Sequence, residues 1–255
     1  GCAGSLSSAG FWPLISWLIK NRFVDVVVST GAIISEDIYE AMGSRYHKVS
    51  PRADDKDLLK HKLDRFYDHV ADELDYRKME FLLEGFFAWF NRTQKKLAIL
   101  PTYKLLYHLG LWLREKSINS ILAQAAESKV PVFSPALVDS GYGEAWIRAF
   151  AMAPQEERKF IVVDQFAEIE DMLEIAERGR AQGCEKSAIY LGGGVPKDFI
   201  QMTAVSQALK KMSEWVCPFK YAVQITMAIQ QDGGLSSCGV VDEPISWGKE
   251  EAGGE

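Results

Sequence analysis

Short apolar runs alternate with longer amphipathic stretches along most of this chain. The short runs are rich in β-branched residues, which is typical of buried parallel strands. Five runs are predicted to form strands: Val24–Val28, Val130–Phe133, Phe160–Val163, Ala188–Leu191 and Tyr221–Ile225. Phe166–Ala181 and Asp198–Trp215, which lie between them, carry apolar residues at helical spacing. This alternation predicts an α/β fold with a Rossmann-like parallel sheet and helices on both faces.

A longer charged region separates the first predicted strand from the second. We expect residues 44–116 to form a helical insertion, in which Asp55–Phe90 is broken into two or three helices. The apolar run Phe11–Ile19 is too short to span a membrane and contains Pro13, so it predicts a first helix packed on the sheet. Residues 1–255 are expected to form one domain that lacks pieces at both ends, because the chain begins at Gly1 rather than Met.

Composition narrows the classes of function. A chain of 255 residues, 47% of them hydrophobic, can bury one substantial core. A formal net charge of −6 disfavours nucleic-acid binding by bulk electrostatics. No run of about 20 apolar residues occurs, so no membrane span is expected. The four cysteines are widely spaced and the four histidines share no metal-binding spacing, which predicts no metal site and idle thiols in a reducing cytoplasm.

Ligands of open parallel sheets bind at the carboxyl ends of the strands, so the loops there are where chemistry is sought. Gly192-Gly193-Gly194 follows a predicted strand and precedes a helix, and it suits either a phosphate or a plain strand–helix turn. Residues 4–10 are small or carry hydroxyl groups, and they suit either a phosphate cradle or a helix cap.

Two segments with charged residues, the loop 134–144 and the region around Lys249, fit either a ligand-binding or catalytic role or a purely structural one. In the loop 134–144, Asp139 suits a ribose hydroxyl and Glu144 a cationic amine, but both also suit the first turn of a helix. Lys249 follows Trp247 and several acidic residues near the end of the chain. A lysine amine must be uncharged to attack an imine, and burial against apolar rings favours that state. The alternative is a surface lysine on a polar tail.

Five segments taken together resemble the deoxyhypusine synthase family, most closely its bacterial deoxyhypusine synthase-like members. They are VDVVVSTGAIISEDIYEAMG (24–43), VPVFSPALVDSGYGEAW (130–146), IYLGGGVPKDFI (189–200), KYAVQIT (220–226) and DEPISWGK (242–249). They occur in the family's order across nearly the whole chain. The ending SWGK is the most specific, since its lysine carries the family's chemistry.

The resemblance implies an NAD-dependent transferase. NAD takes a hydride from spermidine, the aminobutyl group of spermidine passes to an enzyme lysine, and an acceptor amine then receives it. The acceptor is a lysine of a translation initiation factor in the true synthase, and putrescine in homospermidine-forming relatives. The family also implies a cytoplasmic homotetramer with sites between subunits. No nucleic acid or membrane partner is implied.

The resemblance assigns roles by position. Lys249 is the nucleophile. Residues that match polyamine contacts are Glu144, Asp198, Glu243 and Trp247. Residues that match NAD contacts are Ser5, Thr30, Gly31, Glu36, Asp139, Gly192 and Gly193. Asp198 stands where the eukaryotic synthase has a histidine, and Leu235 or Ser236 replaces an acidic group, so the substrate preference is open.

Two alternatives lie outside this activity. One is a catalytically altered module that binds NAD or a polyamine, which the pocket substitutions and the missing ends suggest. The other is an NAD-dependent deacylase of similar fold. A deacylase uses a histidine base, and no histidine occurs in the strand-end loops of this chain.

Overall fold

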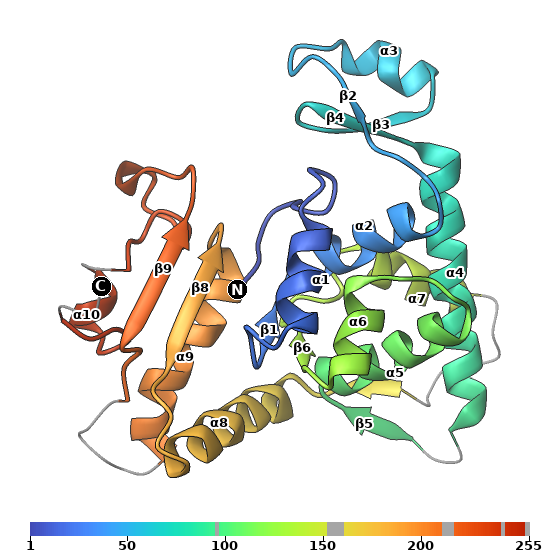
Figure 1. Cartoon of the computed structure of the whole chain (residues 1–255). Helices are drawn as coiled ribbons and strands as arrows, with labels where there is room; N and C mark the ends of the chain where they lie inside the picture. Colours follow the sequence, from blue (N-terminus) through green and yellow to red (C-terminus); the bar gives the residue numbers. More distant parts are fainter. Residues whose placement is uncertain (95–96, 152–160, 211–216, 241–242, 253–255) are drawn as a thin grey trace.

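The computed structural model describes residues 1–94, 97–151, 161–210, 217–240 and 243–252. Within them, parallel strand pairs alternate with helices, which confirms the predicted α/β class (Figure 1). Strand β1 (Val27–Val28) pairs in parallel with β6 (Val132–Phe133), and β8 (Ser187–Leu191) pairs in parallel with β9 (Tyr221–Ile225). Both β1 and β6 are shorter than the predicted strands.

The first three residues join these two pairs. The Cys2 amide donates to the Val28 carbonyl at 2.8 Å, and the Ala3 amide donates to the Leu191 carbonyl at 2.9 Å. Cys2 forms parallel bridges on both sides, so the strands run in the order β9, β8, residues 1–3, β1, β6. The sequence did not predict this connecting strand, because three residues carry no readable periodicity.

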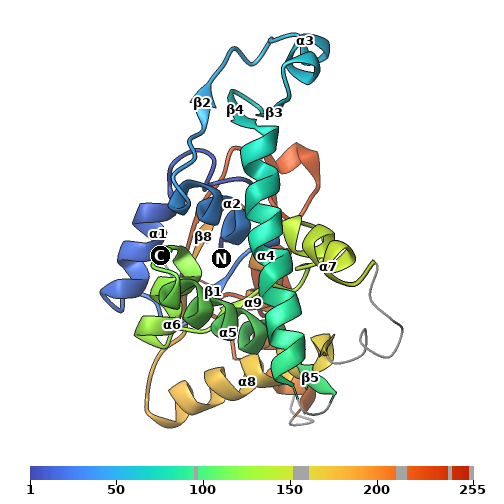
Figure 2. The ribbon, with the colours of Figure 1, turned by 90° about the vertical axis from the view of Figure 1, so that its right-hand side faces the viewer.

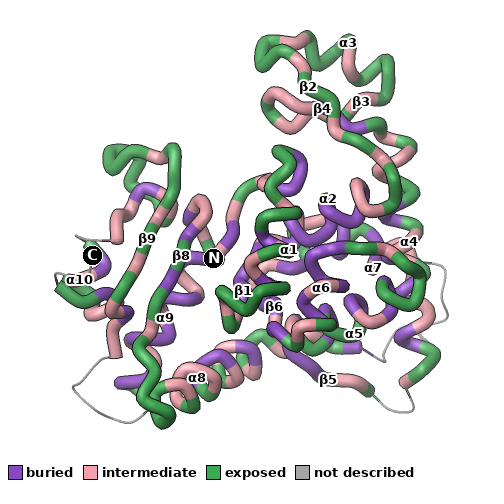
Figure 3. Tube along the Cα trace, viewed as in Figure 1, coloured by how far each residue is buried: buried purple, intermediate pink, exposed green. Residues whose placement is uncertain are grey.

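Side chains of β1 and β6 alternate between two apolar layers, as strand geometry requires. Val27 and Val132 belong to the larger core, which includes residues of α1 (Trp12–Lys20), α2 (Gly31–Ala41), α5 (Thr102–Glu115) and α6 (Ile121–Ser128). Val28 and Phe133 pack in a smaller core with residues of α8 (Gln165–Ala181) and α9 (Gly194–Lys210). Helices therefore cover both faces here (Figure 3).

The outer strand pair is covered differently. Tyr190 of β8 lies in the smaller core with Ile200 of α9. On the opposite face, Val223 and Ile225 of β9 are 54% and 64% exposed. Among the described residues, this face of β8 and β9 is therefore left largely uncovered. A further parallel pair, β5 (Ala98–Leu100) and β7 (Ile161–Val163), lies at the other side of the molecule (Figure 1). Phe160, predicted as part of that strand, lies outside the described residues.

The predicted helical insertion is only partly helical. After α2 the chain forms a three-stranded antiparallel sheet, ordered β2 (His47–Lys48), β4 (His69–Asp72) and β3 (Leu63–Phe66). Helix α3 (Asp55–Lys60) precedes β3, and α4 (Glu73–Thr93) follows β4. The small sheet and α3 project from the body at the N-terminal end of α4 (Figures 1 and 2).

The boundaries of the insertion also need correction. The hairpin turns at Tyr67, whose φ is +58°, and it buries Val70 and Ala71 against the body. These two apolar residues fit a helix pattern and a strand pattern equally well, which is why Asp55–Phe90 was predicted to form two or three helices and no strands. The predicted insertion extended to residue 116, but β5 and α5 belong to the body. Strand β5 pairs with β7, and helix α5 packs on α6 and β6.

Helix starts are set by side-chain caps. Thr30 accepts a hydrogen bond from the Ile33 amide at the start of α2, and Ser120 accepts one from Ala123 at the start of α6. Asp164 accepts from Phe166 and Ala167 at the start of α8. Helix α9 begins four residues before the predicted Asp198, within the glycine run, and residues 211–215 of its predicted end lie outside the described part of the chain. Polar side chains are thereby fixed at the strand ends.

Candidate functional site

Lys249 is anchored in the fold and does not lie on a loose tail. It follows the short helix α10 (Glu243–Ser246), and its amide donates to the Pro244 carbonyl at 2.9 Å. Gly248 has a φ of +68°, a conformation that glycine adopts without steric cost, and this turn brings the next residues beside the chain that enters β9. There the Phe219 amide donates to the Lys249 carbonyl at 2.9 Å. The backbone of Lys249 is therefore held on both sides.

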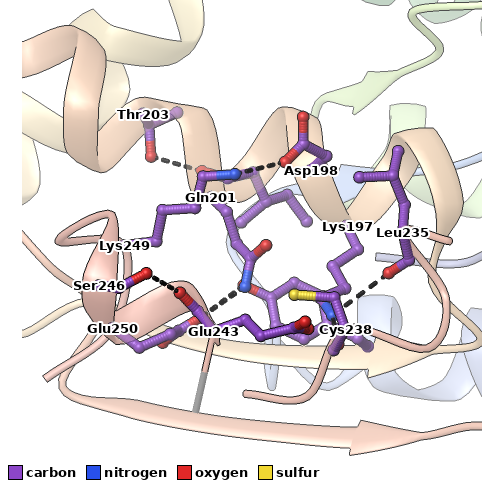
Figure 4. Close-up of polar contacts among 12 residues, drawn as sticks. Lys197, Asp198, Gln201, Thr203, Leu235, Cys238, Glu243, Ser246, Lys249 and Glu250 are labelled. Atoms are coloured by element: carbon purple, nitrogen blue, oxygen red, sulfur yellow. Dashed lines mark hydrogen bonds and ion pairs between the residues drawn. The ribbon is translucent and has the colours of Figure 1, made fainter. Parts of the chain in front are cut away.

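The side chain of Lys249 is largely enclosed and ion-paired. Its Nζ donates to Oδ1 of Asp198 at 2.6 Å, and only 13% of the lysine side chain is exposed (Figure 4). The Nζ lies 5.8 Å from the centre of the Trp247 ring, within the range of a cation–π contact. Asp198 lies in the first turns of α9, and it reaches Lys249 because α10 packs near that helix. Three predicted site residues thus meet here.

A pocket of about 190 Å³ opens beside this ion pair. Its lining combines α9, α10 and the loop before α10: Asp198, Gln201, Leu235, Cys238, Pro244, Trp247 and Lys249. Apolar walls with a few polar groups suit an aliphatic chain that carries amines. Glu243, another predicted polyamine contact, is exposed. Burial raises the pKa of the Cys238 thiol, and a hydrogen bond with Glu243 raises it further, which places Glu243 beside this lining residue.

Lys197 is a buried cation that sequence reasoning missed. It is 2% exposed, and its Nζ donates to Gln224 Oε1 at 3.0 Å, to the Leu235 carbonyl at 3.4 Å and to the Cys238 carbonyl (Figure 4). Desolvation lowers the pKa of this lysine. Lys197 therefore ties the loop that walls the pocket to β9. The sequence feature that could have indicated its role is its position: Lys197 lies just after the glycine run at the start of α9 and directly precedes Asp198.

Glu250 forms a second set of buried polar contacts next to Lys249. It is 4% exposed and accepts hydrogen bonds from Gln201 Nε2 at 2.9 Å and from the Tyr190 hydroxyl at 3.3 Å. Burial raises the pKa of its carboxyl group. These bonds hold the residue after Lys249 against α9 and β8, so they also restrict the position of Lys249.

Several residues predicted to contact NAD gather at the carboxyl end of β1. The Ser5 hydroxyl donates to Glu36 Oε2 at 2.7 Å, and Thr30 Oγ1 donates to the Gly4 carbonyl at 3.3 Å. Gly31 opens α2, and its missing Cβ leaves room for the Ser140 hydroxyl. Glu36 is 3% exposed, and burial raises the pKa of its carboxyl group to about 7, while the hydrogen bond from Ser5 opposes the shift.

The remaining predicted NAD contacts have structural explanations of their own. Asp139 is exposed on the loop before α7 (Gly141–Ala151). A Cβ on Gly192 would lie 3.2 Å from the Ala3 carbonyl oxygen, and one on Gly193 would lie 2.5 Å from the Ser236 Cα. Close backbone packing therefore requires both glycines without any ligand. Gly193 also brings the start of α9 against the loop that walls the Lys249 pocket.

Glu144 is not part of the Lys249 pocket in this chain. It lies in the first turn of α7, while α10 lies at the opposite end of the molecule (Figure 1). Its neighbour is Glu80 of α4, whose pKa is raised to about 7 by burial and, secondarily, by a hydrogen bond with the Glu144 carboxyl. The two acidic groups that the sequence assigns to one substrate, Glu144 and Glu243, are thus far apart in a single chain.

Other kinds of site find no support in the described part of the chain. No group of three or more histidine, cysteine, aspartate or glutamate side chains is arranged to hold a metal ion there. Among the helices of the same residues, none combines the length and the apolar character needed to cross a membrane. The four cysteines, Cys2, Cys184, Cys217 and Cys238, are free thiols.

Comparisons with known proteins agree on one family. The family model for deoxyhypusine synthase matches residues 1–255. A probable deoxyhypusine synthase 2 from Archaeoglobus fulgidus is 38% identical over 249 residues, covering 98% of this chain and 76% of the relative. A deoxyhypusine synthase-like protein from Coxiella burnetii is 31% identical, covering 97% of this chain and 67% of the relative. Both relatives are matched along nearly the whole of this chain.

A solved structure shows the same fold. The crystal structure of a candidate deoxyhypusine synthase from Entamoeba histolytica superposes with a TM-score of 0.54 at 20% sequence identity. The match covers 76% of this chain and 58% of that chain, so this chain spans less than two thirds of the solved protein.

Proposed function

Because the chain belongs to the deoxyhypusine synthase family, a family of aminobutyl transferases, we propose that it moves the aminobutyl group of spermidine to an acceptor amine through an imine on Lys249. One observation carries the proposal. Lys249 is enclosed in a pocket of about 190 Å³ with a carboxylate 2.6 Å from its Nζ and the Trp247 ring beside it. An enclosed lysine with a proton acceptor suits amine exchange at an imine.

Lys249 forms the covalent bond in this proposal. Asp198 takes a proton from the lysine ammonium, and the free amine attacks the imine carbon of dehydrogenated spermidine. The bond from that carbon to the departing nitrogen breaks, and 1,3-diaminopropane leaves with the proton. Lys249 then carries the aminobutyl group as an imine. The acceptor amine attacks the same carbon and releases Lys249 unchanged. The Lys249 side chain is only 13% exposed, which limits the access of water to this imine.

We also propose NAD as the cofactor, bound in a Rossmann-like manner at the carboxyl end of β1. The residues there fit such a group: the start of α2 at Thr30 and Gly31 suits a phosphate, and the buried Glu36 with Ser5 suits a polar ring or ribose. Gly192 and Gly193 contribute by shaping the neighbouring turn, and Asp139 contributes a carboxylate from its exposed loop. These residues would hold NAD, which would supply the hydride acceptor for oxidation of spermidine and the hydride donor for reduction of the imine on the acceptor amine.

The separation of Glu144 from Lys249 supports an oligomeric enzyme. If both side chains contact one spermidine molecule, they belong to different subunits, because α7 and α10 lie at opposite ends of one chain (Figure 1). A homotetramer of the kind that the sequence resemblance implies meets this requirement. The free cysteines fit a reducing compartment, and we place the protein in the cytoplasm.

Release of 1,3-diaminopropane tests the activity directly. The purified chain is incubated with spermidine and NAD, alone or with putrescine or a candidate protein lysine, and the products are measured by mass spectrometry. We expect 1,3-diaminopropane only when NAD is present, and an acceptor-linked aminobutyl group with one of the two acceptors. The Lys249→Arg variant keeps the positive charge but not the chemistry, and it serves as the control. Tight NAD binding without any 1,3-diaminopropane contradicts the proposal and favours a binding module.

A further inference from the structure

A second and larger cavity lies at the amino ends of the strands, on the edge of the sheet opposite to the proposed cofactor site. Its volume is about 650 Å³, well within the range of roughly 300–1,000 Å³ that is usual for small-molecule sites. Asp25 of its lining precedes β1, Lys129 and Val130 precede β6, and Ala98 begins β5. The proposed transfer reaction uses none of these residues.

One wall of this cavity is aromatic. It consists of Phe90 at the end of α4 and of Tyr103, Tyr107 and His108 on α5. The Phe90 and His108 rings lie 5.1 Å apart, and Tyr103 is held by the ring of Phe133, 4.7 Å away. Burial lowers the pKa of His108, so this imidazole is neutral at pH 7 and adds a flat ring without a charge. Such a wall suits a planar aromatic molecule.

The rest of the lining is cationic. Lys104, Lys129 and Arg178 line the cavity, and Asp25 is the one carboxylate among the lining residues. Lys104 is partly neutralised by Asp171 at 3.3 Å, and Arg178 lies 3.9 Å from Glu174 in an exposed pair. The chain as a whole carries a net charge of −6, so three cations around one cavity are not a consequence of its overall composition. Among the groups that line the cavity itself, three cations face one carboxylate, and this excess favours an anion.

We propose that this cavity binds a planar aromatic molecule with an anionic group. Its ring lies against Tyr107 and His108, and its anionic group lies between Lys129 and Arg178. Because the cavity opens at the amino ends of the strands, its occupant does not compete with spermidine or NAD. The site is therefore separate from the proposed transferase activity, and its test does not depend on whether that activity is confirmed.

The fluorescent probe 8-anilinonaphthalene-1-sulfonate, an aromatic anion, tests this site on the full chain. We expect saturable binding of one probe per chain, weakened by added salt, and the same affinity in the Lys249→Ala variant. The double variant Lys129→Gln/Arg178→Gln is expected to bind about fivefold more weakly, since two charges are lost near the anion. Tyr107→Leu is also expected to weaken binding. Lys60→Gln, an exposed change on α3, is the control and leaves the affinity unchanged.

Displacement experiments separate this site from the cofactor site. Competition by AMP indicates a preference for a phosphate, and competition by salicylate indicates a preference for a carboxylate; either result supports the site. Displacement by NAD, unsaturable binding, or equal affinity in the double variant overturns it. Circular dichroism verifies that each variant is folded. If a variant does not fold, the salt dependence of probe binding to the unchanged chain decides: binding that is independent of salt overturns the proposal.

Discussion

Lys249 and Asp198 form the ion pair on which the proposed chemistry depends. The carboxylate 2.6 Å from Nζ is the group placed to accept a proton from the lysine. A lysine that must attack as a free amine therefore relies on this neighbour. The sequence resemblance places a histidine of the eukaryotic synthase at the position of Asp198.

Replacing Asp198 by asparagine tests this dependence. The amide side chain keeps the size of the carboxylate but does not stabilise a nearby ammonium by charge. We expect Asp198→Asn to lower kcat by at least roughly tenfold, because the proton acceptor is lost. The Asp232→Asn variant, at an exposed position, is the control. A kcat equal to that of the unchanged enzyme would show that Asp198 takes no part.

Glu36 makes stability depend on pH. Its carboxyl group has an ordinary pKa of 4.5, and burial raises the pKa in the folded chain to about 7. Between these values the unfolded chain loses the proton while the folded chain keeps it, so stability falls as pH rises through this window and is constant above it. The shift corresponds to about 3 kcal/mol at most.

The Glu36→Gln variant removes this titration. Its free energy of unfolding in urea, measured at pH 5 and pH 8, is expected to fall less between these values than that of the unchanged chain. Glu170→Gln, an exposed change on α8, is expected to leave the pH dependence as it is. Identical pH dependence in Glu36→Gln and in the unchanged chain refutes the assignment.

At the level of elements, the alternation of apolar runs predicted where along the chain the strands occur. It predicted less accurately the residues at which each strand begins and ends. β9 matches its predicted range, while β1 lacks Val24–Val26, because those residues approach the sheet without pairing. The hairpin of β3 and β4 was missed, since Leu63–Phe66 has no strict apolar alternation and lies between two helical patterns. Local pattern cannot report pairing between distant segments, and that pairing decides both cases.

The connecting strand at residues 1–3 was missed for the same reason, because only its pairing with distant segments identifies it as a strand. Cys2→Pro removes the amide that donates to Val28, and proline in the middle of a sheet is strongly unfavourable. We expect this variant to lose roughly 3 kcal/mol of stability in urea unfolding. Cys2→Ala keeps the amide and is expected to lose about 1 kcal/mol or less. Equal stability of the two variants would mean that this strand does not hold the two halves together.

At the scale of the whole molecule, the sequence motifs predicted which residues matter but not which of them meet in one chain. Lys249, Asp198 and Trp247 come together, as do Ser5, Thr30, Gly31 and Glu36. Glu144 joins neither group and lies beside Glu80. Motif order along a chain carries no information about subunit boundaries, so this separation was visible only in three dimensions.

Mixed oligomers test the proposed sharing of a site between subunits. Glu144→Gln and Lys249→Ala are each expected to be inactive alone. Co-expressed, they form hybrids in which one site has both original residues, and we expect about a quarter of the activity to return. Activity is measured as release of 1,3-diaminopropane. Mixtures of two Lys249→Ala preparations with different tags serve as the control. Hybrids without activity would contradict a shared site.

The covalent intermediate on Lys249 is the central claim, and trapping tests it most directly. The chain is incubated with spermidine and NAD, treated with borohydride to reduce any imine, digested and analysed by mass spectrometry. The account predicts one added aminobutyl group on the peptide that contains Lys249, absent without NAD and absent in Lys249→Arg. An unmodified Lys249 in a chain that binds NAD and spermidine, or an aminobutyl group on a different lysine, would contradict it.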